Sequence, residues 1–207
     1  MPRAGLNPAI VVDEAARLAD EIGFDRLTLA ALAARFRVAV PSLYKHLDGL
    51  GALRRGVAVL AVRELGAALD AALADTEPDD ASSRIAALAR AYRVYALAHP
   101  GRYAATIRAA SPVDPEHRTA SDAVLAIVLG VLEARGLTGD EGIDAARTLR
   151  AALHGFVALE AAGGFGLPRD VDRSFGRLVR TLDAGLTAEP AAGRPDLPAP
   201  VSPAPRR

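Results

Sequence analysis

Residues 28–47 of this 207-residue chain read TLAALAARFRVAVPSLYKHL and are its most informative segment. Leu29, Leu32 and Phe36 recur at helical spacing, which predicts a short first helix. Pro41 suits the first position of a second helix, because its φ is already fixed and its missing N–H would be unpaired there. Two short helices joined by a tight turn form a helix-turn-helix, whose second helix can enter the major groove of DNA.

A preceding segment supplies a third helix for this motif. Asn7 is a good N-cap before a proline, and apolar residues then recur with helical period as far as Ile22. Gly23 ends that helix, and Thr28 is the N-cap of the next. We therefore expect a three-helix DNA-binding domain over residues 1–48.

The rest of the chain predicts more helices separated by Gly- and Pro-rich breaks. They are expected at about 50–74, 81–98, 102–109, 115–135, 140–162 and 171–186. With no convincing strand, the fold class is all-α with about nine helices. The Pro- and Ala-rich tail, residues 187–207, cannot bury a core and should be disordered.

Composition agrees with a helical protein that works in a reducing compartment. About half of the residues are apolar but only 4% are aromatic, which favours closely packed helices over a β-sandwich. The absence of cysteine excludes disulfides and thiolate metal sites and is compatible with the cytosol. We find no membrane-spanning run, and Asp13 and Glu14 interrupt the early apolar run too soon for a signal peptide, so a cytoplasmic location is expected.

Formal net charge is zero, but the helix-turn-helix region is basic. Residues 26–55 hold six Arg or Lys and one Asp, which is +5, so the remainder must be −5. Basic charge on a motif shaped for a groove is the electrostatic footprint of nucleic-acid binding. An ordinary solvated face would also explain this charge.

Several side chains of this region have chemistry suited to DNA. Ser42 and Lys45 lie one turn apart on one helix face, and Lys45 can donate to guanine O6 and N7 or to phosphate. Tyr44 and His46 suit phosphates, although both could instead pack against the first helix. The expected DNA-binding residues are Thr28, Arg37, Pro41, Ser42, Tyr44, Lys45 and His46.

The segment resembles the TetR family of bacterial transcriptional repressors. The likeness rests on LYKHL at 43–47, on GFDRLT at 23–28 and on the Asp-Glu-Ala-Ala pattern at 13–16. HPGRYAATI at 99–107 and ALHGFVALEAAGGFG at 152–166 resemble the C-terminal domain of a TetR branch named for a Trp-His-Gly motif. Here that motif reads Leu-His-Gly, so the Trp is absent.

The resemblance implies a ligand-responsive homodimer. Residues 49–186 would form a helical ligand-binding and dimerisation domain, with the dimer built from the helices at 140–162 and 171–186. A small-molecule effector would shift the helix at 50–74 and release a palindromic operator. Two positions depart from the family pattern: Arg37 stands where Gly is common in the turn, and Leu50-Gly51 stand where a DNA-contacting Lys is common.

A set of aromatic and polar residues in the C-terminal half could line a ligand pocket. Tyr92, Tyr95 and His99 fall at i, i+3 and i+7 on one helix face. The full set of expected ligand-binding residues is Tyr92, Tyr95, His99, Tyr103, Ile107, His154, Val157 and Glu160, with Phe156 and Phe165 as further candidates. Ordinary core aromatics with satisfied polar tips would give the same pattern.

Catalytic and cofactor signatures were not found. The four histidines show no metal-ligand spacing, and no nucleophile-elbow, P-loop or dinucleotide-binding motif occurs. We expect no enzyme activity, metal or cofactor. The alternative to a DNA-binding regulator is a helical ligand-binding or scaffold protein whose helix-turn-helix no longer reads DNA.

Overall fold

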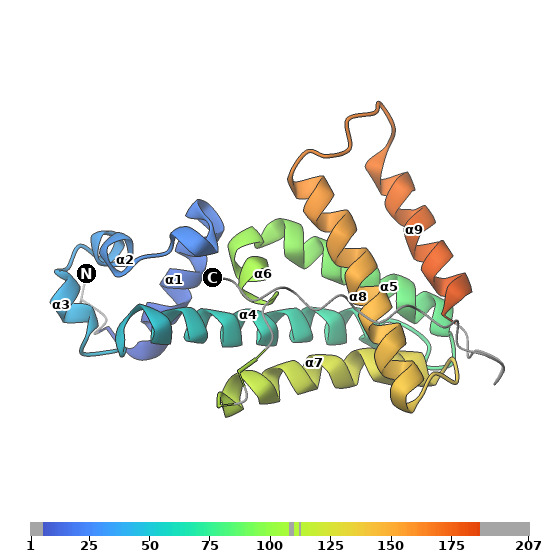
Figure 1. The fold of residues 1–207 in the computed structure, drawn as a ribbon, viewed down its shortest axis with the longest axis horizontal. Coiled ribbons are helices and arrows are strands. Elements are labelled where there is room, and N and C mark those ends of the chain that lie inside the picture. The colour runs from blue at the N-terminus through green and yellow to red at the C-terminus, as the bar shows by residue number, and fades with distance from the viewer. Residues whose placement is uncertain (1–5, 108–109, 112, 187–207) are drawn as a thin grey trace, which may run out of the picture.

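The computed structural model describes residues 6–107, 110–111 and 113–186, and that part of the chain is all-helical, as the sequence predicts (Figure 1). In chain order the elements are α1 (Pro8–Ile22), the 3-10 turn η1 (Phe24–Arg26), α2 (Leu29–Phe36), α3 (Val40–Leu43), α4 (Gly49–Ala74), α5 (Ala81–Ala98), α6 (Pro100–Ala105), α7 (Pro115–Glu133), α8 (Gly139–Ala161) and α9 (Val171–Gly185). The predicted disordered tail lies outside the described residues.

Two helices differ from the sequence prediction. Helix α3 ends at Leu43 and continues as a turn, in which the His46 N–H donates to the Leu43 carbonyl at 2.9 Å. Its start has no side-chain cap because the N-cap is Ala39, and Pro41 removes an N–H, so little holds a longer helix together. Helix α6 begins at Pro100 instead of Arg102, because proline fits the first helical turn.

The buried residues form two cores, and both α4 and α6 contribute to each of them. The N-terminal core joins α1, α2 and α3 to the first half of α4 through Leu27, Leu32, Leu43 and Leu53, all at most 1% exposed. The larger core packs the rest of α4 against α5, α7, α8 and α9. Figure 1 shows α4 running along most of the molecule, so it links the two cores mechanically.

Candidate DNA-binding surface and ligand cavity

The helix-turn-helix is held in place by one cap and two buried leucines. The Thr28 hydroxyl oxygen accepts a hydrogen bond from the Ala31 N–H at 3.1 Å, which begins α2. Leu32 of α2 and Leu43 of α3 are fully buried in the N-terminal core. These anchors fix the outer face of α3 relative to the rest of the domain.

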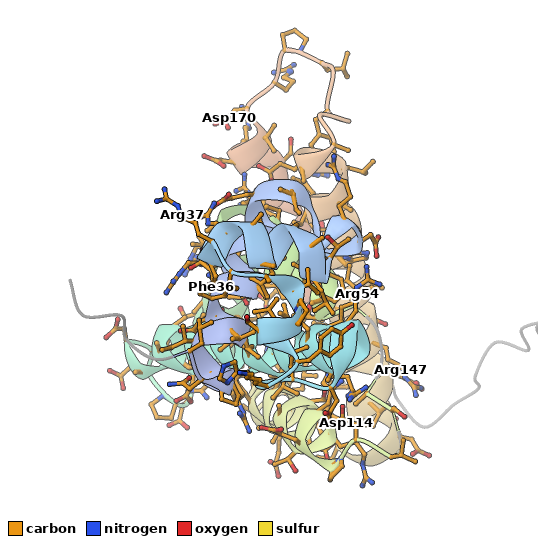
Figure 2. All side chains as sticks on the ribbon, turned by 90° about the vertical axis from the view of Figure 1, so that its left-hand side faces the viewer. Phe36, Arg37, Arg54, Asp114, Arg147 and Asp170 are labelled. Carbon is orange, nitrogen blue, oxygen red and sulfur yellow. The ribbon has the colours of Figure 1, made fainter. Side chains whose placement is uncertain are left out.

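Arg37 has a left-handed backbone in the turn between α2 and α3. Its φ is 55° and ψ 43°, and it is the sole non-glycine residue with positive φ in the described part of the chain. The Arg37 and Val38 N–H groups donate to the carbonyls of Ala34 and Ala33, as in a Schellman motif. The exposed Arg37 side chain extends away from the body of the molecule (Figure 2).

The α3 region presents polar side chains outward from the buried Leu43. Pro41, Tyr44 and Lys45 are exposed, and Tyr44 keeps 58% of its surface accessible. Ser42 and His46 are half-buried. An exposed tyrosine beside a lysine can donate to phosphate oxygens without first breaking a contact within the protein.

Two arginines of the basic segment are used inside the domain. The Arg35 guanidinium pairs with Glu14 at 2.7 Å and with Glu21 at 2.6 Å, so hydrogen bonds to these carboxylates raise its pKa. The Arg54 guanidinium donates to backbone carbonyls of Asp25, at 2.9 Å, and Leu27. The +5 charge of this segment therefore overstates the charge that faces solvent.

Arg55 lies on the exposed side of α4, one turn after Gly51. Its Nη1 atom lies 3.6 Å from where a Cβ on Gly51 would be, so the guanidinium reaches back over the first turn of α4. This places a positive charge at the end of α4 nearest α3. Arg37, Lys45 and Arg55 are thus exposed cations at this end of the molecule.

The N-terminal core contacts the larger core through α6. The Asp20 carboxylate of α1 accepts from the Arg102 N–H at 2.8 Å and pairs with the Arg102 side chain at 3.1 Å. Arg102 also pairs with Glu64 of α4 at 3.1 Å. The backbones of α6 and α1 touch at Gly101, where a Cβ would lie 2.0 Å from the Ala19 carbonyl oxygen. Helix α6 is therefore in direct backbone contact with α1.

A cavity of about 150 Å³ lies between α4, α5, α7 and α8. Its lining residues are Val62, Leu65, Leu69, Leu88, Tyr92, Thr106, Ser121, Val124, Leu125, Val128, Ala146, Leu149, Arg150 and Leu153. Mostly apolar walls with a few polar groups are typical of small-molecule sites.

The structure distributes the expected ligand-binding residues over several places. Tyr92 lines the cavity, whereas Tyr95 and His99 line a separate groove between α4 and α5. The Tyr95 hydroxyl donates to the Ala61 carbonyl at 3.0 Å, and His99 Nδ1 lies 3.5 Å from an Asp20 carboxylate oxygen. Tyr95 and His99 therefore belong to the contact between the two cores.

Tyr103 and His154 connect to the cavity through Tyr92. The hydroxyl oxygens of Tyr92 and Tyr103 lie 2.7 Å apart, and the Tyr103 hydroxyl lies 2.5 Å from His154 Nδ1. Burial raises the pKa of Tyr92 and of Tyr103, so both phenols stay neutral and act as hydrogen-bonding groups. Tyr103 and His154 thus do not line the cavity, but they form a hydrogen-bond chain with Tyr92, which does.

The remaining expected residues lie elsewhere. Val157 is buried in the larger core, and Ile107 is 44% exposed after α6. Glu160 forms a two-hydrogen-bond pair with Arg93 at 2.8 and 2.5 Å, which ties α8 to α5. The polar cavity residues Thr106, Ser121 and Arg150 were missed. Helical periodicity gave no signal for Arg150, because it neighbours the buried Leu149 but is itself exposed.

The described part of the chain has no membrane-spanning helix, because none of its helices is both long and apolar enough to cross a membrane. Within the same residues, no group of three or more His, Cys, Asp or Glu side chains is placed to hold a metal ion.

Comparisons with known proteins agree with this geometry. Residues 11–48 match the model described as bacterial regulatory proteins, tetR family, and residues 85–182 match the tetracyclin repressor-like C-terminal domain. An HTH-type transcriptional regulator of Mycobacterium tuberculosis is 38% identical over 186 residues, covering 88% of this chain and 83% of its own.

Solved structures share the whole fold. A protein from Rhodococcus sp. RHA1 is 27% identical with a TM-score of 0.76, covering 90% of this chain and 98% of its own. The Streptomyces coelicolor TetR family protein ActR, in complex with actinorhodin, has a TM-score of 0.67 at 20% identity, covering 88% and 96%. The likeness to ActR concerns the fold alone.

Proposed function

Because this chain belongs to the TetR family, and is a transcriptional regulator with a helix-turn-helix DNA-binding domain, we propose that it represses transcription from a palindromic operator. Residues 1–48 would bind DNA, and residues 49–186 would bind an effector and dimerise. The main support is the exposed row of Pro41, Tyr44 and Lys45 outside the buried Leu43.

We assign two roles to the expected DNA-binding residues. Ser42, on α3, and Lys45, in the turn that follows it, would contact base edges in the major groove. Thr28, Arg37, Pro41, Tyr44 and His46 would contact or position the phosphate backbone. Arg55 joins this second group, because its guanidinium lies over the first turn of α4.

Replacing Lys45 by alanine should weaken DNA binding by about tenfold without lowering the free energy of unfolding. Lys45 is exposed, so its removal leaves no cavity, whereas one lost charge-assisted contact costs about 1–3 kcal/mol. A fluorescence-anisotropy titration with the chain's own upstream DNA, repeated at several salt concentrations, measures this effect.

Arg90→Ala is the matched control, because Arg90 is an exposed cation on α5, outside the N-terminal core. It should bind DNA as the wild type does. If the wild type and Lys45→Ala bound DNA with equal affinity, Lys45 would not contact DNA. No binding by the wild-type protein would favour the alternative, a ligand-binding protein that does not read DNA.

We propose that an effector acts through α6. The cavity lies beside Thr106, the residue that ends α6, and α6 meets α1 at the contact between Gly101 and Ala19. A ligand that shifts α6 would tilt α1 and change the separation of the two recognition surfaces in a dimer. The bound ligand of ActR supports a ligand site in this fold.

A homodimer through α8 and α9 is the third part of the proposal. The hairpin between these helices projects from the body (Figure 1), and it carries exposed apolar residues. Leu159 is 52%, Phe165 36% and Leu167 80% exposed. A second copy of the chain packed on this side would cover these residues. Exposed apolar patches often mark such interaction sites.

Replacing Leu159 by glutamate should convert the dimer to a monomer and lower affinity for a two-site operator by at least tenfold. A charge buried between two copies is costly, and a monomer loses the gain from two linked contacts. Sedimentation velocity at micromolar protein gives the mass, and Val113→Glu, before α7, is the control, because Val113 is 89% exposed and does not line the cavity. A wild-type protein that sediments as a monomer would refute the dimer.

A further inference from the structure

The cavity has one charged group at its edge. Arg150 of α8 is the one charged residue among the lining residues in the described part of the chain. Ser121, Thr106 and Tyr92 supply the hydroxyl groups, and the other lining residues are aliphatic. The charge of Arg150 also lowers the pKa of Tyr92, against the larger upward effect of burial, so the guanidinium and this phenol are electrostatically coupled.

Arg150 is held by weak acceptors, two backbone carbonyl groups. Its Nη2 atom donates to the carbonyls of Thr106, at 3.1 Å, and Ile107, at 3.4 Å. No carboxylate pairs with it among the residues that the structure describes. An arginine fork forms stronger and shorter hydrogen bonds with a carboxylate than with neutral carbonyls.

The cavity has room for a small apolar ring. Its volume of about 150 Å³ is similar to that of an apolar protein cavity that holds one benzene molecule. The aliphatic side chains of α4, α5, α7 and α8 can pack against an apolar ring. They offer no hydrogen-bonding or charged partner to a second charged group on the ligand. A cationic ligand would meet Arg150 and no compensating carboxylate on the lining.

We propose that the cavity binds a compact monocarboxylate with a ring-sized apolar body, its carboxylate held by Arg150. The acid group would also accept a hydrogen bond from the Ser121 hydroxyl at the same cavity. This inference rests on the proposed function, because it names the chemical class of the effector.

Arg150 connects this ligand to the DNA-binding domain. The guanidinium that takes the carboxylate is the one that holds the Thr106 and Ile107 carbonyls at the end of α6. Capture of an acid weakens that hold, and α6 contacts α1 through Gly101. A carboxylate would therefore bind more tightly when α6 has shifted from its position in this structure, and a shift in population requires such a difference.

Isothermal titration calorimetry on the full-length protein without DNA tests the binding step. The probes are benzoate and cyclohexanecarboxylate, each compared with its own amide, which has the same shape and no charge. At least one acid should bind about tenfold more tightly than its amide. Arg150→Gln should remove this difference, and Arg150→Lys should keep part of it.

Arg147→Gln is the matched control, because Arg147 lies one turn earlier on α8 and pairs with Asp144, outside the cavity. It should keep the preference for the acid. The inference is wrong if neither acid binds more tightly than its amide, or if Arg150→Gln leaves the preference unchanged.

A separate measurement of DNA binding tests the regulatory role of the ligand independently of its binding. The affinity for the chain's own upstream DNA is measured with and without the acid that binds. A fall in affinity supports both the ligand class and its regulatory role. Selective binding in calorimetry with unchanged DNA affinity supports the ligand assignment and refutes release by this ligand.

Discussion

Gly101→Ala should lower the free energy of unfolding by roughly 3 kcal/mol or more, which is large for the addition of one methyl group. An alanine Cβ would lie 2.0 Å from the Ala19 carbonyl oxygen and 2.5 Å from the Asp20 nitrogen. Both are backbone atoms of α1, so no side-chain rotation relieves the overlap. Helix α6 would have to separate from α1 and strain the Asp20–Arg102 contacts.

Urea unfolding followed by circular dichroism at fixed protein concentration measures this loss. Gly130→Ala is the matched control, because Gly130 lies within α7 with no atom within 4 Å of the new Cβ. Alanine there should be neutral or stabilising by up to about 1 kcal/mol. Equal stability of Gly101→Ala and the wild type would show that α6 does not hold this contact in solution.

Arg37→Gly should raise the free energy of unfolding by about 1 kcal/mol and weaken DNA binding several-fold. A left-handed φ of 55° is strained for a residue that has a Cβ atom. Glycine has no Cβ, so it relieves this strain. The same change removes an exposed cation beside α3. Loss of one phosphate contact should also make the slope of log affinity against log salt concentration shallower by about one.

Arg37→Lys and Arg37→Asn separate the charge from the backbone effect. Lysine keeps the charge and the strain, so it should retain most of the DNA affinity. Asparagine tolerates the left-handed conformation but has no charge, so it should behave like glycine in DNA binding. Unchanged DNA affinity in Arg37→Gly would show that Arg37 has no phosphate contact.

The sequence alone determined the helix-turn-helix, the all-helical fold and most helix bounds. These features depend on residues close together in the chain: Asn7 and Thr28 as caps, Gly23 as a break, and apolar residues at helical spacing. The left-handed backbone of Arg37 lies at the turn position where, according to the family resemblance, glycine is common.

Only the tertiary structure decided which side chains share a site. Arg35 and Arg54 count toward the basic charge of residues 26–55, but their partners Glu14 and Asp25 come from other helices or turns. The cavity combines α4, α5, α7 and α8, so local periodicity could not reveal that Arg150 faces it. The helix-turn-helix is specified by short-range geometry, whereas the effector site depends on helix packing between residues far apart in the chain.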